Sequence, residues 1–379
     1  MNPLPSAAAW TGHYRLHPGH APAISGQRPI LAPGQLARLL QGQTTDQAVQ
    51  SVGQLFAMCA HAHQACARWA IDAAMRDSAA PSAQGDHTVL CLDTARDHLR
   101  CMALDWPQRL AAAGTAQPPD LHWLRGCPLS LSTPKAGQHP HAAQESLQAL
   151  AQWLHTAVLL EPLADWLSRC HEPATLLQWC EVHALRLAPA RALAGAQPLL
   201  ALPTLPIRVL HPIDATAMRA LAQSMLHTPG FCERPTWSGL CAETGAWARW
   251  RDQTVRQPAP TAAAWTRLSS RWEELVKIAQ EAHARVQVGM HQPMLAQGTL
   301  VLDKRQAMAW CEMARGLLVH VVSLDARGRV DDYRVLAPTE WNFHPDNSLG
   351  QAVRSLPEGD CGHARLLGAA FDPCVACEV

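Results

Sequence analysis

The chain has 379 residues, and its 31 basic and 31 acidic side chains give a formal net charge of zero. This balance argues against the basic surface that nucleic acids or acidic membranes attract, and the 48% of hydrophobic residues can supply one large core. The start of the chain lacks a basic segment followed by an apolar one, and no stretch of about 20 apolar residues occurs. We therefore expect a cytoplasmic protein whose 13 cysteines are free thiols or metal ligands.

The first clear element in chain order runs from Thr45 to Met75, where apolar residues recur at the spacing of one inward helix stripe. Cys59 and His63 share a face of this predicted helix, and Cys66 follows one turn after His63. A cysteine inside an apolar helix is usually a small hydrophobic residue, and a histidine there can be a satisfied core histidine. His61 lies off the face of Cys59 and is a poor candidate for a site.

The rest of the chain is rich in alanine and leucine, which predicts a mainly α fold with a small β component. Two strands, 317–324 and 329–336, are expected to form a hairpin through the turn Asp325-Ala326-Arg327-Gly328. This hairpin would carry Arg315 and Thr339 at its two ends, close to each other. Further helices are predicted at 92–104, 144–160, 214–225 and 262–286, with proline-rich connections near 117–140 and 186–213.

The last motif is Cys374-Val375-Ala376-Cys377, two thiols three residues apart near the end of the chain. Thiolates suit zinc, nickel and iron. A redox dithiol normally opens a helix inside a βαβ unit, which this position does not supply, so a metal site or chance spacing remains. Two ligands rarely complete a site, and the segment around Cys59 is the best source of more.

These motifs resemble those of nickel-iron hydrogenase large subunits. The segment Phe371 to Cys377 is similar to their C-terminal metal motif, and Leu55 to His63 is similar to R-x-C-G-x-C-x-x-x-H. Three further segments match in the same order: 243–249 resembles E-x-G-P-L-A-R, 312–316 resembles E-A-P-R-G, and 338–342 resembles P-T-T-W-N. The resemblance implies the large-subunit fold as a single domain, 1–379, with a metal site between the central helices and the C-terminal segment.

The departures from the family bear on function. In the family four cysteines hold nickel, and two of them also bridge to an iron that carries cyanide and carbon monoxide. Cys59 and Cys377 match the bridging positions and Cys374 a terminal nickel ligand, whereas Phe56 replaces the fourth cysteine. Ala37 stands where the family has a proton-relaying glutamate. The chain also stops at Val379, without the family's final histidine and cleavable tail.

With these departures, the sequence resembles the hydrogenase accessory proteins of the HupK/HoxV type. The resemblance implies a maturation factor without enzymatic activity, a scaffold or carrier that holds or assembles an Fe(CN)2(CO) unit transiently, with nickel unlikely. Cys59, Cys374 and Cys377 would bind the metal. Arg315 and Thr339 would donate to the cyanides, and His63 would lie beside them.

The implied partners are the chaperone and cyanide-ligand synthesis proteins of hydrogenase maturation and the large-subunit precursor, with neither nucleic acid nor membrane. Two other functions stay open. One is a degenerate or active large subunit that oxidises hydrogen, and the other is a structural zinc protein that uses Cys59, His63, Cys374 and Cys377. For Arg315 an ion pair with Glu312, three residues earlier, is the alternative.

Overall fold

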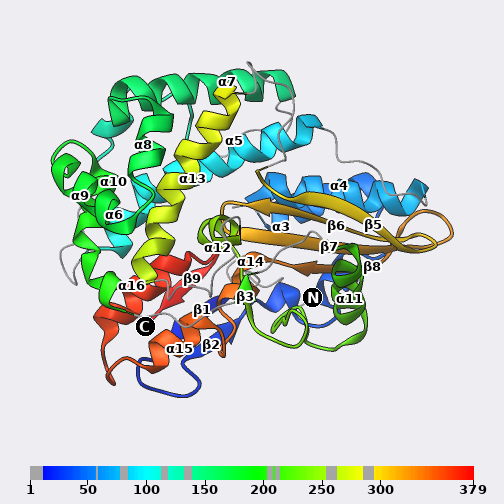
Figure 1. Cartoon of the computed structure of the whole chain (residues 1–379). Helices are drawn as coiled ribbons and strands as arrows, with labels where there is room; N and C mark the ends of the chain where they lie inside the picture. The colour runs from blue at the N-terminus through cyan, green and yellow to red at the C-terminus, as the bar shows by residue number, and fades with distance from the viewer. Residues whose placement is uncertain are drawn as a thin grey trace.

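The computed structural model describes residues 12–56, 59–76, 84–111, 118–131, 139–202, 208–209, 214–252, 263–284 and 294–379. Its main parts are a four-stranded antiparallel sheet, in the order β5-β6-β7-β8, and a large group of helices to one side of it (Figure 1). The mainly α fold with a small β component is confirmed. The strands are β5 (Gln297–Asp303), β6 (Gln306–Met313), β7 (Gly316–Leu324) and β8 (Val330–Leu336).

Both faces of the sheet are covered, which explains the continuous apolar run of β7. Its odd-numbered residues, such as Val319, pack with α11 (Ala215–His227), whereas Leu318 and Val322 belong to the main core on the side of α4. The predicted β7–β8 hairpin is confirmed, with Val319 opposite Leu336 and Gly328 in the turn at a φ of 74°. Strands β5 and β6 were not predicted.

The predicted single helix from Thr45 to Met75 is wrong, because the chain turns between two helices, α3 (Thr45–Leu55) and α4 (Ala60–Arg76). A capping box of Thr44 and Gln47 starts α3, and the amide of Cys59 bonds back to the carbonyl of Phe56. After the turn α4 packs against α3. Gly53 permits this approach, since a Cβ there would lie 2.2 Å from the side chain of Gln64.

The helical predictions are confirmed with shifted ends, although residues 262, 285 and 286 of the last one lie outside the described ranges. Helix α13 (Ala264–Ala284) runs through the helical part and contacts α5, α7, α8 and α16 (Figure 1). Two helices continue as π-helical turns, η3 (Cys101–Asp105) after α5 and η5 (Leu154–Leu159) after α7. The helices of this part are α5 (Gln84–Arg100), α6 (Trp106–Arg109), α7 (Pro140–Trp153), α8 (Leu163–Arg169), α9 (Pro173–His183) and α10 (Ala188–Gly195); the others are α2 (Gln35–Leu40), α12 (Ala246–Asp252), α14 (Pro338–Asn342), α15 (Ser348–Arg354) and α16 (Cys361–Phe371).

The segment 186–213, predicted to be a proline-rich connection, instead contains α10 and the 3-10 turn η6 (Gln197–Ala201). Pro189 stands in the first turn of α10, where its missing N–H has no helical partner to lose. In the other predicted connection, 117–140, the described residues include only the short turn η4 (His122–Leu124) before α7 begins. Residues 117 and 132–138 lie outside the described ranges.

Two segments from opposite ends of the sequence pair beside α16. Strand β1 (His13–Leu16) pairs antiparallel with β2 (Ile24–Gln27) and parallel with β9 (Ala376–Glu378), so that Cys377 lies opposite Tyr14. A further pair, β3 (Arg208–Val209) and β4 (Ala242–Glu243), lies nearby. The β1–β9 pairing holds the C-terminal segment against the N-terminal one (Figure 1).

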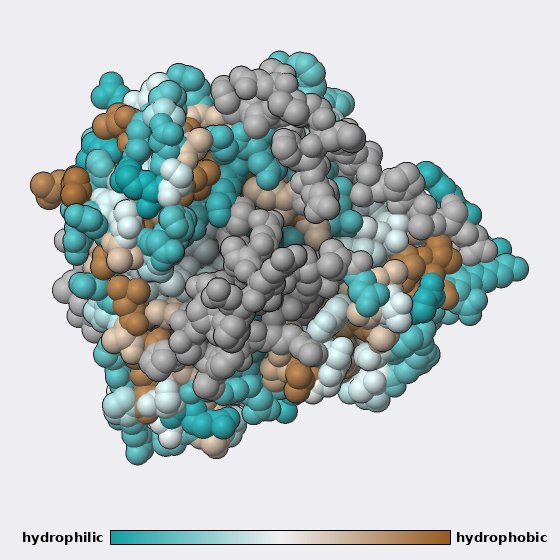
Figure 2. All heavy atoms as spheres, in the orientation of Figure 1, coloured by the Kyte–Doolittle hydropathy of each residue, from teal (hydrophilic) through white to brown (hydrophobic). Residues whose placement is uncertain are grey.

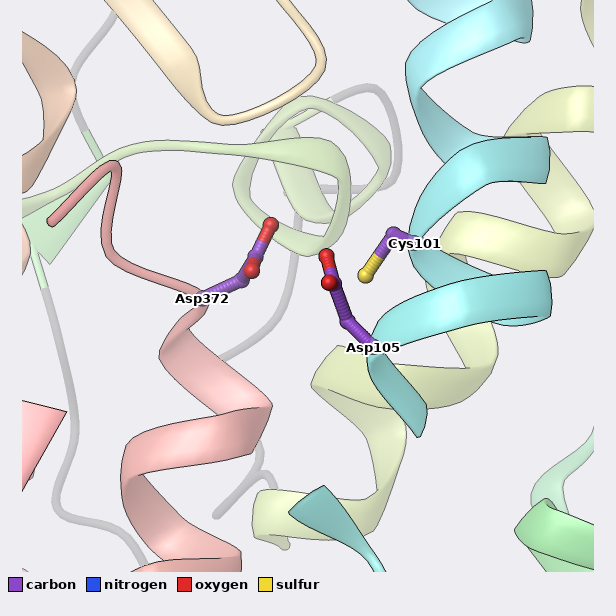
Figure 3. Close-up of side chains that lie close together, drawn as sticks. All are labelled: Cys101, Asp105 and Asp372. Atoms are coloured by element: carbon purple, nitrogen blue, oxygen red, sulfur yellow. The ribbon is translucent and has the colours of Figure 1, made fainter. Parts of the chain in front are cut away.

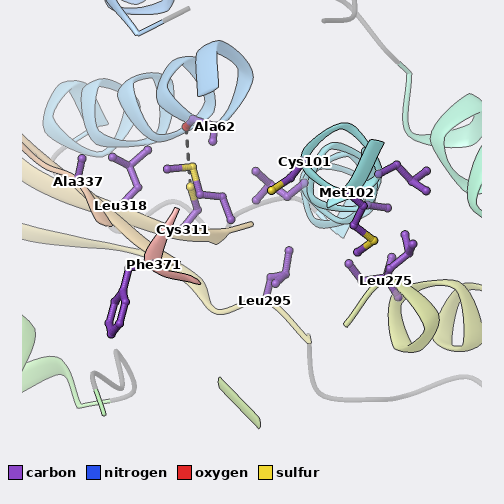
Figure 4. Close-up of a cluster of buried hydrophobic side chains, with 14 of the residues drawn as sticks. Ala62, Cys101, Met102, Leu275, Leu295, Cys311, Leu318, Ala337 and Phe371 are labelled. Atoms are coloured by element: carbon purple, nitrogen blue, oxygen red, sulfur yellow. Dashed lines mark hydrogen bonds between the residues drawn. The ribbon is translucent and has the colours of Figure 1, made fainter. Parts of the chain in front are cut away.

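The main core joins the sheet, α4, η3, α13 and α16 through buried apolar side chains (Figure 4). At its centre Cys311 of β6 donates a weak hydrogen bond to the carbonyl of Ala62 on α4, at 3.8 Å. On the face shown in Figure 2, hydrophobic residues form small groups separated by hydrophilic ones. Within the described part of the chain, no helix has both the length and the apolar character needed to cross a membrane.

Candidate metal centre

Two thiols from distant parts of the sequence meet between α4 and the end of α16. Cys59 lies in the turn before α4, and Cys374 follows the left-handed residue Asp372 that ends α16, at a φ of 41°. Their sulfur atoms are 3.8 Å apart and half-buried. Two thiols at this distance can both bind one metal ion after small movements.

The two thiols share one negative charge. The hydrogen bond from Cys59, the guanidiniums of Arg315 and Arg28 and the hydroxyl of Thr339 together lower the pKa of Cys374 to about 6. The same hydrogen bond, with burial, raises the pKa of Cys59 well above its usual value. At neutral pH Cys374 is therefore a thiolate, Cys59 donates to it, and binding a metal through both sulfurs releases one proton.

Arg315 lies directly behind this pair and is 3% exposed. Its Nη1 is 3.7 Å from the sulfur of Cys59 and 2.5 Å from Asp97 of α5, and its Nε is 3.1 Å from Asp372. The alternative ion pair with Glu312 is not formed, because Glu312 lies beside Arg249 instead. Among the described residues the buried Nη2 of Arg315 finds no hydrogen-bond partner, so it is available as a donor for a bound group.

Thr339 lies at the other end of the hairpin, as predicted, in the first turn of α14. Its hydroxyl oxygen accepts a hydrogen bond from the backbone amide of Cys374 at 3.2 Å. This contact fixes Cys374 and leaves the hydroxyl hydrogen to donate toward the sulfur or a ligand on it. Arg315 and Thr339 therefore hold the dithiol from both sides.

A second buried cation, Arg28, was not among the predicted site residues. Its Nη1 is 3.5 Å from both carboxylate oxygens of Glu340, and its guanidinium lies 5.4 Å from the ring centre of Phe56. Burial raises the pKa of Glu340 to about 7, although Arg28 acts in the opposite direction. A lone arginine outside any motif carries no sequence signal, so only the structure places it here.

Asp372 anchors the segment that carries Cys374. Its carboxylate lies 2.9 Å from Arg109, 3.2 Å from Arg271 and 3.1 Å from Arg315, which come from α6, α13 and the β6–β7 turn. These guanidiniums hold the pKa of the buried carboxyl well below its usual range. Asp372 belongs to the C-terminal motif Phe371 to Cys377, so the sequence already pointed to this residue.

Asp372 also meets Cys101 and Asp105 of η3, and the three point toward one another (Figure 3). Among the described residues, this is the one set of three metal-binding groups within 4.8 Å of one another. Arginines already surround it, however, since Asp105 is 3.2 Å from Arg100 and Asp372 contacts three others. A metal cation would have to displace them, so the cluster fits an internal ion-pair network better than a metal site.

Nδ1 of His63 is hydrogen-bonded inside the core and does not face the dithiol. Its Nδ1 is hydrogen-bonded to Nε2 of His320 at 3.0 Å, and Nδ1 of His320 to the hydroxyl of Tyr333 at 2.7 Å. Its ring also stacks on Phe56, with ring centres 4.0 Å apart. Burial lowers the pKa of His63 well below its usual value and that of His320 to about 3. The chain of three polar groups therefore stays neutral inside the core.

Cys377 lies on β9, away from the pair. Its sulfur faces α16, where a Cβ on Gly368 would be 3.3 Å from it, and burial raises its pKa to about 12. The three sulfurs of the predicted set are not within 4.8 Å of one another. The structure thus brings together Cys59, Cys374, Arg315 and Thr339, but not Cys377.

Comparison with known proteins gives relatives along nearly the whole chain, although no model of a protein family matches it. The hydrogenase expression/formation protein HoxV of Cupriavidus necator is 36% identical over 97% of this chain and 95% of its own length. HupV of Azotobacter chroococcum is 27% identical over 93% of this chain and 92% of its own, and HupK of Rhizobium leguminosarum bv. viciae is 28% identical over 92% and 90%.

Solved structures with the same fold are nickel-iron hydrogenases. An NAD+-reducing NiFe hydrogenase in its H2-reduced state superimposes with a TM-score of 0.51 over 93% of this chain and 92% of its own, at 14% identity. The Ni-Fe-Se hydrogenase of Desulfovibrio vulgaris Hildenborough gives the same TM-score over 92% of both chains, also at 14% identity. These likenesses establish the large-subunit fold alone. From its sequence relatives, the chain belongs to the family of hydrogenase expression/formation proteins that includes HoxV and HupK.

Proposed function

We propose that this protein is a hydrogenase maturation factor that holds or assembles an Fe(CN)2(CO) unit and transfers it to the hydrogenase large-subunit precursor. The observation that carries the proposal is the pair of Cys59 and Cys374, 3.8 Å apart, with a buried arginine 3.7 Å from one sulfur. Soft thiolates suit a low-spin iron, and Nη2 of Arg315, which has no partner in the described part of the chain, is a donor of the kind that a cyanide nitrogen accepts. Thr339 offers a hydroxyl for the second cyanide.

The third predicted ligand, Cys377, would join the pair only after the edge of β9 moves. Strand β9 has three residues and pairs on one side with β1, so few backbone hydrogen bonds oppose such a movement. We propose that the cargo draws Cys377 toward Cys59 and Cys374. His63, whose Nδ1 is held by His320, would position the ring of Phe56 and the start of α4 rather than contact the cargo through that nitrogen.

We propose no catalytic role and no stable nickel site. Phe56 occupies the position of the fourth thiol with a ring packed between His63 and Arg28, and the methyl group of Ala37, on α2, cannot relay protons. Partners would be the chaperone and cyanide-ligand synthesis proteins of maturation and the large-subunit precursor, in the cytoplasm. Neither nucleic acid nor a membrane is required.

The test is an infrared spectrum with metal analysis, on protein purified without oxygen from cells that contain the maturation proteins. Two cyanide bands and one carbonyl band, with iron and without nickel, are the expected result. Equimolar nickel would favour a hydrogenase instead, and zinc without these bands would favour a structural zinc site. Cys374→Ala and Cys377→Ala should each reduce the bands and the bound iron. Cys361→Ala, at an exposed thiol outside the site, is the matched control.

A further inference from the structure

A cavity of about 320 Å³ opens beside Cys59, between the start of α4 and the length of α5. Its polar lining includes His61, Asp93, Asp97 and Arg100, and its apolar lining includes Leu90, Leu131 and Met313. The side chains of His61 and Asp93 are 31% and 20% exposed, so the cavity is open to solvent on this side. A mostly apolar pocket with a few convergent polar groups is typical of sites for small ligands.

His61 and Asp93 form a pair of the kind that holds metal-binding histidines in position. Nδ1 of His61 is 2.6 Å from Oδ2 of Asp93, and the other carboxylate oxygen of Asp93 is 2.7 Å from Nη1 of Arg96. Arg96 therefore fixes the carboxylate through a hydrogen bond, and the carboxylate lies against one nitrogen of the ring at ion-pair distance. A histidine held by a carboxylate through one nitrogen offers the other, here Nε2, to a metal.

The position of His61 sets it apart from His63, which the sequence favoured. His63 points into the core toward His320, whereas His61 lines the same cavity as Cys59. One residue, Ala60, separates His61 from Cys59, so their Cα atoms are at most about 7 Å apart. The same cavity is therefore bordered by both His61 and Cys59.

We propose that this cavity is the loading chamber for the metal cargo, and that His61, positioned by Asp93, is the first ligand that the incoming metal meets. The inference rests on the proposed function, because it needs the dithiol to be the final site. In the transfer step the bond from iron to the nitrogen of His61 breaks as the bond from iron to the sulfur of Cys59 forms. The proton of Cys59 passes to water in the cavity, and the oxidation state of iron does not change.

The chemistry of the walls agrees with this cargo. The carboxylates of Asp93 and Asp97 line the cavity, each beside an arginine, Arg96 at 2.7 Å and Arg100 at 3.3 Å. These guanidiniums carry further N–H groups that can donate to cyanide nitrogens. The apolar side chains can surround a carbonyl ligand, which needs no strong hydrogen bond. Asp97 also holds Arg315, so the same carboxylate borders the cavity and supports the dithiol.

The experiment measures how fast Co(II), used as the probe, reaches the thiols of the metal-free, fully reduced protein without oxygen. Binding is followed by stopped-flow absorption of the charge-transfer band that thiolates give with Co(II). His61→Gln should slow the rise of this band at least about tenfold and leave its final amplitude unchanged, because the thiols remain. His61→Ala should behave alike, and Asp93→Asn, which frees the ring, should give an intermediate rate. Circular dichroism checks that the variants are folded.

His141→Gln is the matched control, because His141 also lies beside a carboxylate, Glu145, on an exposed helix surface outside this cavity. It should load at the wild-type rate. If His61→Gln loads as fast as the wild type, the entry role is wrong while the dithiol site stands. If the wild type gives no thiolate band, or if Cys59→Ala/Cys374→Ala keeps it, the dithiol is not the metal site and both proposals fall.

Discussion

Arg315→Gln should raise the pKa of Cys374, because it removes the cation that favours the shared negative charge. The guanidinium is 3.7 Å from the sulfur of Cys59, which is 3.8 Å from that of Cys374, so it lies within about 7.5 Å of the thiolate sulfur. At an effective dielectric constant of about 20, a unit charge at that distance contributes about 2 kcal/mol. Asp97 and Asp372 offset part of this charge, so we take about 1 pKa unit. The pKa of Cys374, about 6 in the wild type, should then rise to near neutrality.

The assay is the rate of alkylation of the metal-free protein by iodoacetamide at a series of pH values, with each cysteine followed by peptide mass spectrometry. The thiolate is the reacting form, so the midpoint of the rate against pH reports the pKa. The exposed Cys361 is the reference for reagent access in every sample. Arg315→Lys keeps a positive charge and should shift the midpoint less. An unchanged midpoint in Arg315→Gln would refute the assignment of the thiolate to this cation.

Three further predictions concern the surroundings of the pair. Asp372→Asn leaves three arginines without their shared carboxylate and should lower the free energy of unfolding in urea by about 3 to 5 kcal/mol. In the wild type the pKa of the Asp372 carboxyl is depressed in the folded state. Its contribution to stability is therefore complete at neutral pH and is lost as the pH falls below about 4. His320 has a pKa of about 3 in the folded state, so as the pH falls the unfolded chain binds this proton first. The free energy of unfolding should therefore decrease from about pH 6.5 toward pH 3. His320→Gln should reduce the slope of this decrease by about 1.4 kcal/mol per pH unit. Phe56→Cys restores a fourth thiol and should bind more nickel than Phe56→Ala in anaerobic metal analysis; equal nickel would contradict the account of the missing ligand.

The residues of the site that the sequence identified lie in contiguous motifs. Arg315 and Thr339 flank a hairpin whose strands and turn have clear local signals, so their closeness could be predicted. Cys377 could not be placed, because its position depends on β9 pairing with β1, and three residues carry no strand signal of their own. Arg28 lies outside the motifs and reaches the site only through the tertiary fold.

The fold was predicted least well where local pattern and tertiary packing disagree. The apolar spacing continues through Phe56 to Cys59, and only the packing of Gln64 on Gly53 shows that the chain turns back there. Strand β6 contains alanine and methionine, which do not favour strands, and it is stable because both faces are covered. The same turn places His61, rather than His63, in the cavity beside Cys59.

The dithiol joins residues 315 positions apart. At a translation rate of roughly 5 to 20 residues per second, Cys374 leaves the ribosome roughly 15 to 60 s after Cys59. During this interval the first thiol has neither its partner nor Asp372 to hold Arg315 behind it. A nascent chain therefore cannot present the two-sulfur site, and metal capture must wait until the last segment has docked on β1.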